Sequence, residues 1–194
     1  MSCGDKASLV QSSGADSPLA YFYKAAGKSP PVLELLEADA LPQPYRRLLD
    51  HDHDMTPVLE AFYGQAMSLH VFEKQLDDAA LLRRVVLMGD ADRKPVEFGA
   101  IRIHLDQFDH PAQQLIMGGH LPLGTILERL SIEHASHLVG LFRVRCDTMI
   151  KHALSCTGDQ WLYGRHNRLV YVEGRMMAEA FEILPTICQS ADKD

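Results

Sequence analysis

The segment ALLRRVVLMGDADRKPVEFGAIRIHL, residues 80–105, predicts the fold class of this chain. Apolar residues run through positions 80–88 and again through 96–105, and the segment between them is rich in Gly, Asp and Pro. Two such runs around a turn-forming segment are typical of a β-hairpin. Gly99 lies inside the second run, where a glycine indicates a bulge or a close approach of neighbouring atoms.

Residues outside this hairpin extend the same pattern. Further strands are expected at residues 66–76, 138–146 and 176–184 and in a segment that ends at residue 172. Helices are expected at residues 32–38, 45–49, 57–64, 111–117 and 122–130. Strands joined by hairpins, with helices grouped between them, indicate an antiparallel β-sheet in an α+β fold.

The length of the chain sets the expected domain organisation. It has 194 residues, of which 46% are hydrophobic and 23% charged, an ordinary globular balance. One domain with a tail suits this length. We expect residues 1–29, which are rich in small and polar residues, to form a flexible N-terminal tail with an aromatic patch at residues 21–23, and residues 30–194 to form a single domain.

The charge and the cysteines limit the partners that we expect. The formal net charge is −7 and no basic run is present, which argues against nucleic acid as a partner. No apolar run reaches the roughly 18–20 residues of a membrane span, and the N-terminus lacks a signal-peptide pattern. The four cysteines form no CxxC pair, which is typical of free thiols. We therefore expect a cytoplasmic protein with no membrane partner, whose oligomeric state the sequence leaves open.

Two glutamates on the last expected strand are candidates for chemistry. Period-two alternation places Glu179 and Glu182 on opposite faces, and each face is otherwise apolar. A carboxylate in such surroundings must be paired or must have its pKa raised, which suits a general acid or base. The alternative is a structural ion pair or a side chain that points to solvent at an edge.

Arginines on the strands are candidate anchors for an anion. Arg83 and Arg84 are adjacent and therefore point to opposite faces of an apolar strand. At least one guanidinium is then half-buried and needs an anionic partner, either a protein carboxylate or a substrate carboxylate. Alternation does not tell which of the two points inward. Arg165 belongs to a third cationic segment, residues 162–168, which also contains aromatic residues and a glycine.

Histidines raise the question of a metal site. His51 and His53 form an HxH pattern, and His134 with His137 could add ligands. A metal site needs at least a third ligand at a defined position, and the spacing supplies none. The sequence therefore predicts that no metal is bound.

Several short segments, taken in order, resemble the chorismate pyruvate-lyase superfamily. They lie at residues 48–56, 82–87, 95–100, 122–127, 162–165 and 182–185, within a region from about residue 45 to 185. The resemblance is closest to the bacterial and cyanobacterial group formerly treated as a family of unknown function. It implies an antiparallel sheet with helices packed on one side over a small enclosed cavity. It also implies a cofactor-independent carbon–oxygen lyase that converts chorismate to pyruvate and 4-hydroxybenzoate or a related hydroxybenzoate.

The resemblance also implies roles for single residues. Arg83 would hold the ring carboxylate of the substrate, and Glu182 would lie at the opposite end of the ring and move the proton. Characterised lyases have one more residue between this glutamate and the following proline, here Pro185. Glu179 is therefore an alternative for the functional carboxylate.

The remaining site residues follow from the same motifs. The substrate-binding residues would be Met55, Thr56, Leu123, Gly124 and Arg165. The alternative function is a non-catalytic sensor for an aromatic acid, because the fold resembles ligand-binding domains of transcription regulators. A regulator needs a basic DNA-reading helix pair, which the acidic sequence does not show, so the sequence favours the enzyme.

Overall fold

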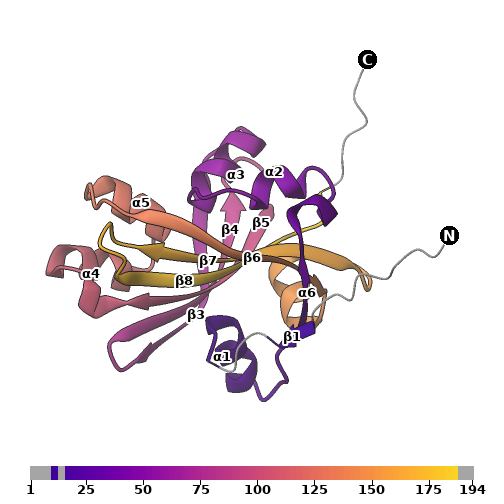
Figure 1. Cartoon of the computed structure of the whole chain (residues 1–194), viewed down its shortest axis with the longest axis horizontal. Coiled ribbons are helices and arrows are strands. Elements are labelled where there is room, and N and C mark those ends of the chain that lie inside the picture. The colour runs from indigo at the N-terminus through magenta and orange to yellow at the C-terminus, as the bar shows by residue number, and fades with distance from the viewer. Residues whose placement is uncertain (1–9, 13–15, 188–194) are drawn as a thin grey trace.

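An eight-stranded antiparallel sheet organises the chain in the computed structural model, which describes residues 10–12 and 16–187 (Figure 1). The strand order is β1-β2-β6-β7-β8-β5-β4-β3. The strands are β1 (Val10–Ser12), β2 (Val32–Leu36), β3 (Met67–Asp77), β4 (Ala80–Gly89), β5 (Pro95–His104), β6 (Ala135–Arg145), β7 (Trp161–Val170) and β8 (Met176–Leu184). The predicted α+β class with an antiparallel sheet is confirmed, and the hairpin expected at residues 80–105 is formed by β4 and β5.

The helices lie between the strands along the chain. They are α1 (Pro18–Ala25), α2 (Tyr45–Leu49), α3 (Met55–Tyr63), α4 (His110–Gly118), α5 (Leu123–Arg129) and α6 (Thr148–Leu154). Short 3-10 turns, η1 and η2, occupy Ala38–Ala40 and Leu105–Gln107. Among the described residues, every helix is too short to cross a bilayer.

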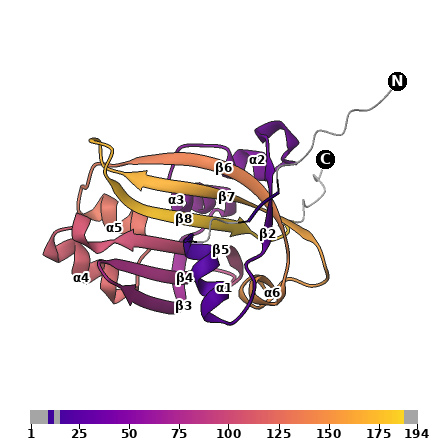
Figure 2. The same cartoon turned by 60° about the horizontal axis from the view of Figure 1, so that its bottom comes forward.

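The helices pack on the sheet through three apolar clusters. As expected for this fold, α2, α3, α4 and α5 share one side of the sheet, packing on residues such as Leu87, Leu141 and Ile103. Helices α1 and α6 contact the other side, where alternate residues of the same strands form a separate cluster. Figure 2 shows α1 in front of the sheet and α3 behind it.

Helix α1 lies within residues 1–29, the segment expected to be a flexible tail. The side chains of Leu19 and Phe22 are fully buried, and the Oγ of Ser17 accepts a hydrogen bond from the Ala20 N–H at 3.1 Å. The aromatic patch at residues 21–23 therefore anchors a helix on the sheet, and the folded body begins before residue 30. Residues 1–9 and 13–15 of the expected tail lie outside the described residues.

Strand β2 corrects another expectation, since residues 32–38 were predicted to be a helix. The segment pairs with β1 and β6 instead, and Glu34 forms an ion pair with Arg143 at 2.7 Å. A helix this short has little stability of its own, so partners from distant parts of the chain determine its conformation. Helix α6 was not predicted. The thiols of Cys146 and Cys156 are free, and Cys3 and Cys188 lie outside the described residues.

Gly164 on β7 lies at a position with no space for a side chain. A Cβ at Gly164 would lie 2.5 Å from the Glu182 carbonyl oxygen and 2.7 Å from the ring of Phe142. Because the nearest atom belongs to backbone, we expect Gly164→Ala to lower the free energy of unfolding by about 1–3 kcal/mol. Gly140 on the neighbouring strand has nothing within 4 Å of its Cβ position, so Gly140→Ala is the matched control. Equal unfolding midpoints of the two variants in urea would contradict this packing.

Candidate functional site

A cavity of about 80 Å³ lies between the sheet and the first turns of α3 and α5. Drug-sized pockets run to roughly 300–1,000 Å³, so this cavity suits a small molecule. Six of the seven site residues named from the sequence line it: Met55, Thr56, Arg83, Leu123, Gly124 and Glu182. Arg165 is not among the lining residues.

Arg83 is the arginine that points into the cavity. Its side chain is buried, with 2% of the residue exposed, and no hydrogen-bond partner among the described residues reaches its Nε or Nη1. Burial lowers its pKa to about 10. Arg84 points to the other side of the sheet, where it pairs with Glu73 at 3.4 Å and stacks on Phe72. A buried cation without a partner requires an anion, which the cavity can admit.

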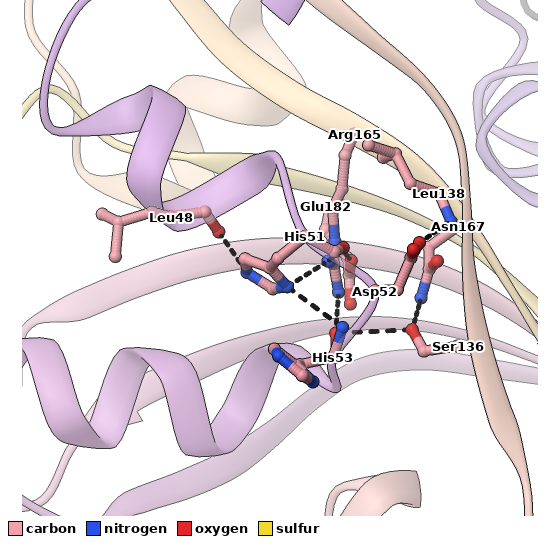
Figure 3. Close-up of polar contacts among 9 residues, drawn as sticks. All are labelled: Leu48, His51, Asp52, His53, Ser136, Leu138, Arg165, Asn167 and Glu182. Carbon is pink, nitrogen blue, oxygen red and sulfur yellow. Dashed lines mark hydrogen bonds and ion pairs between the residues drawn. The ribbon is translucent and has the colours of Figure 1, made fainter.

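Glu182 lies beside a different arginine. Its Oε2 accepts a hydrogen bond from the Arg165 Nε at 2.5 Å (Figure 3). Arg165 is fully buried. Arg165 also donates to the carbonyl oxygens of His51 and His53, at 3.1 and 3.0 Å. Glu182 therefore forms a structural ion pair, which was the alternative to an acid–base role in the sequence analysis. Arg165, which was expected to bind substrate, donates to protein acceptors instead.

The contacts of His51 define its protonation state. Its Nε2 lies 2.8 Å from the carbonyl oxygen of Leu48, which can only accept, so Nε2 carries the proton. Its Nδ1 then accepts from Arg165 at 3.1 Å and from the His53 N–H at 3.2 Å. Burial and the charge of Arg165 lower its pKa, in agreement with a neutral ring. Within the described part of the chain, no group of three or more His, Cys, Asp or Glu side chains is arranged to hold a metal ion.

Glu179, the alternative carboxylate, is not a lining residue of the cavity. Its Oε1 lies 2.8 Å from His166 Nε2 and 3.3 Å from Arg168 Nη2. The hydrogen bond with His166 is the main cause of its lowered pKa. The structure therefore brings Glu182, and not Glu179, to the cavity.

Glu97 is a cavity residue that the sequence reasoning missed. The residue is 5% exposed, and its Oε2 has no hydrogen-bond partner among the described residues. Burial, followed by the negative charge of Glu182, raises its pKa well above the usual value. The pattern that drew attention to Glu182, one carboxylate on an otherwise apolar strand, also applies to Glu97 and would have found it.

Asp54 and Asn167 add unpaired acceptors to the cavity wall. The Oδ1 of each is buried, and neither has a hydrogen-bond partner among the described residues. Asn167 donates from Nδ2 to the Ser136 Oγ at 2.8 Å, which directs its Oδ1 away from that contact. The cavity thus holds unpaired donors at Arg83 and unpaired acceptors at Asp54 and Asn167, so it is suited to a polar ligand.

Asp54 also separates the cavity from an open groove of about 750 Å³ that it shares with His53, His134 and His137. Its Oδ2 lies 3.0 Å from His134 Nε2. A Cβ at Gly124 would lie 2.7 Å from the same oxygen, so this glycine allows the carboxylate to lie against the start of α5. Asp54, and not Thr56, is the residue before helix α3, which begins at Met55.

Comparisons with known proteins identify the fold. No known protein-family model matches the chain, and no curated protein does. The chain is similar to PhnF from Mycobacterium smegmatis, at 8% identity and a TM-score of 0.52 over 72% of this chain and 69% of that one. It is similar to the effector domain of PhnF, at 9% identity and a TM-score of 0.52 over 68% of this chain and 87% of that domain. A ligand-binding domain of a putative GntR-family transcriptional regulator from Bordetella bronchiseptica matches at 12% identity and a TM-score of 0.46, over 65% of this chain and 92% of that one. At these identities the likeness shows a shared fold, the chorismate lyase-like fold.

The expected carbon–oxygen lyase activity is wrong. The solved structures to which the chain is similar with TM-scores above 0.5 include PhnF and the effector domain of PhnF, whereas no family model and no curated protein of a lyase matches the chain. The site agrees with this correction, because the Glu182 carboxylate that was expected to move a proton is held by the buried guanidinium of Arg165.

The Arg165 contacts predict a large loss of stability when this side chain is removed. Arg165→Ala leaves Glu182 without its partner, so the free energy of unfolding should fall by about 3–5 kcal/mol in urea denaturation. Arg168 on the same strand is 45% exposed and pairs with Glu179 at 3.3 Å, so Arg168→Ala should cost less than about 1 kcal/mol. Similar losses in the two variants would contradict the structural role of Arg165.

The ion pair between Asp54 and His134 predicts a pH-dependent coupling. The hydrogen bond to Asp54 raises the pKa of His134. The pair should therefore stabilise the fold fully below the unfolded histidine pKa of about 6.5 and lose this contribution as the pH rises through the folded pKa. A double-mutant cycle of His134→Gln and Asp54→Asn should give a coupling energy on the order of 1 kcal/mol at pH 6 and a smaller one at pH 8.5. A coupling that grows with pH would contradict this assignment.

Proposed function

We propose that this protein binds a small carboxylic acid without turning it over and acts as a ligand-binding or sensor domain, with aromatic acids as the preferred class. The observation that carries the proposal is the buried guanidinium of Arg83, whose Nε and Nη1 have no partner among the described residues. This group lines the cavity together with the start of helix α3 at Met55 and Thr56.

The energetics of Arg83 support a ligand at this position. A buried charge without a partner destabilises a protein, and an alternative apolar side chain of similar size is often more stable. A carboxylate supplies the missing charge and forms strong, charge-assisted hydrogen bonds with a guanidinium. The stability lost to an unpaired Arg83 in the free protein is therefore recovered when an acid binds.

The rest of the cavity supports binding without catalysis. Glu182, the carboxylate that was expected to move a proton, is held by Arg165, and burial raises the pKa of Glu97. PhnF provides a precedent for an effector domain with this fold.

Arg83→Met tests the proposal directly. Titration calorimetry of the wild-type chain with benzoate and 4-hydroxybenzoate should show binding, and Arg83→Met should weaken it by at least about 30-fold. The same substitution should leave the melting temperature unchanged or raise it, because it removes an unpaired buried charge.

Arg84→Met is the matched control, since Arg84 is adjacent in sequence but lies on the opposite side of the sheet. Its affinity for the acids should stay within about threefold of wild type. Wild-type protein incubated with chorismate should return it unchanged beyond the rate in buffer. Release of pyruvate, or equal loss of binding in both arginine variants, would overturn the proposal.

A further inference from the structure

We propose that Glu97, as a neutral carboxylic acid, determines the charge of the ligand: the cavity accepts a monocarboxylate with an uncharged polar group at its far end and rejects a dicarboxylate. The inference deepens the proposed binding function and rests on it. It assigns to Glu97 a role in ligand specificity.

The strand register places Glu97 near Glu182 and Arg165, so that two carboxyl groups lie near one guanidinium. Gly99 on β5 pairs with Glu182 on β8, so Glu97 lies two residues along the strand on the same face. Arg165 on β7 pairs in register with Glu182 and donates to its carboxylate. The charge of Arg165 acts on both carboxyl groups, but its guanidinium is hydrogen-bonded to Glu182 and not to Glu97, so ionisation of Glu97 is disfavoured.

Among the described residues that line the cavity, the charged side chains other than Glu97 are Arg83 on β4, Glu182 on β8 and Asp54 before α3, so Arg83 is the one cation in this lining. Arg165 on β7 and His51 contact each other beside Glu182. Burial and the charge of Glu182 raise the pKa of Glu97, and Arg165 opposes them. Arg165 is already bonded to Glu182, and His51 is neutral by its contacts.

Arg83 lies too far along the sheet to serve as the partner of Glu97. Glu97 pairs in register with Leu87, and Arg83 pairs with Ile101, so the two positions are four residues apart along the strands. At about 3.3 Å per residue, that separation is roughly 13 Å between backbones. Both side chains nevertheless line the cavity, and they therefore mark its two ends.

The two ends have different chemistry. A carboxylate at the Arg83 end meets an unpaired cation. At the other end, the protonated Glu97 can donate its O–H to a hydroxyl, carbonyl or amide oxygen of the ligand. A second ligand carboxylate there would approach the negative charge of Glu182 and would have no free cation to pair with.

Matched ligands that differ only in charge test this inference. Terephthalate is compared with its monoamide, 4-carbamoylbenzoate, and succinate with succinamate, because each pair keeps size and shape nearly constant. Calorimetry of the wild-type chain at pH 6.5 should show that the monoamide binds at least tenfold more tightly than the diacid in whichever pair the cavity admits. Benzoate, which lacks a polar far end, is the reference ligand.

Two variants of Glu97 separate hydrogen bonding from packing. Glu97→Gln keeps a neutral donor, so the affinity for the monoamide should stay within about threefold of wild type. Glu97→Leu removes the donor, so the monoamide should lose at least tenfold in affinity while benzoate changes by less than threefold. Equal binding of diacid and monoamide, or equal loss of benzoate and monoamide in Glu97→Leu, overturns the inference and leaves the proposed function intact. Absence of binding for every acid, benzoate included, overturns the proposed function itself.

A measurement without ligand gives an independent result. Since the folded pKa of Glu97 is raised, the wild-type chain should lose stability as the pH rises above the unfolded value of about 4.3 toward the folded value. Glu97→Gln cannot ionise, so its advantage in unfolding free energy over wild type should grow between pH 5 and pH 8. A difference that stays constant over this range would show that Glu97 is already ionised in the folded protein and would overturn the inference.

Discussion

The guanidinium of Arg165 is the interaction on which the site depends. It is fully buried and joins the Glu182 carboxylate on β8 to the carbonyl oxygens of His51 and His53. Residues 51–53, which Arg165 contacts, lead directly into helix α3, whose first residues line the cavity. Removal of one partner from a buried ion pair lowers the free energy of unfolding far more than an exposed pair contributes to it. The Arg165 side chain therefore stabilises both the sheet and the segment that leads into helix α3.

The chain buries two arginines on one face of the sheet, and the contrast between them separates structure from function. Arg165 meets protein acceptors through all three of its nitrogens, whereas Arg83 has none among the described residues for its Nε and Nη1. A fully satisfied buried cation is explained by the fold alone. An unsatisfied one lowers stability, and its presence is understood only if a ligand supplies the missing anion.

Local patterns predicted the parts of the molecule that depend on short-range sequence, such as the hairpin at residues 80–105 and the last strand. They also singled out Arg83 and Glu182, because a charge in an apolar strand stands out without knowledge of the fold. Whether such a charge faces a protein partner or an open cavity depends on strand register between distant segments, which alternation within one strand does not contain. For the same reason residues 32–36 became an edge strand, since their partner is β6 and not a neighbour in sequence.

The same reasoning explains why the fold was predictable and the activity was not. A cavity with a cation for a carboxylate can serve either a lyase or a ligand-binding domain, so the motifs that encode the cavity do not distinguish the two. Proton transfer requires in addition a carboxyl group that is free to change its charge at the substrate. Here Glu182 is paired with Arg165, and burial, followed by the charge of Glu182, raises the pKa of Glu97. The unpaired buried guanidinium of Arg83 in the cavity wall is the feature that favours a bound anion.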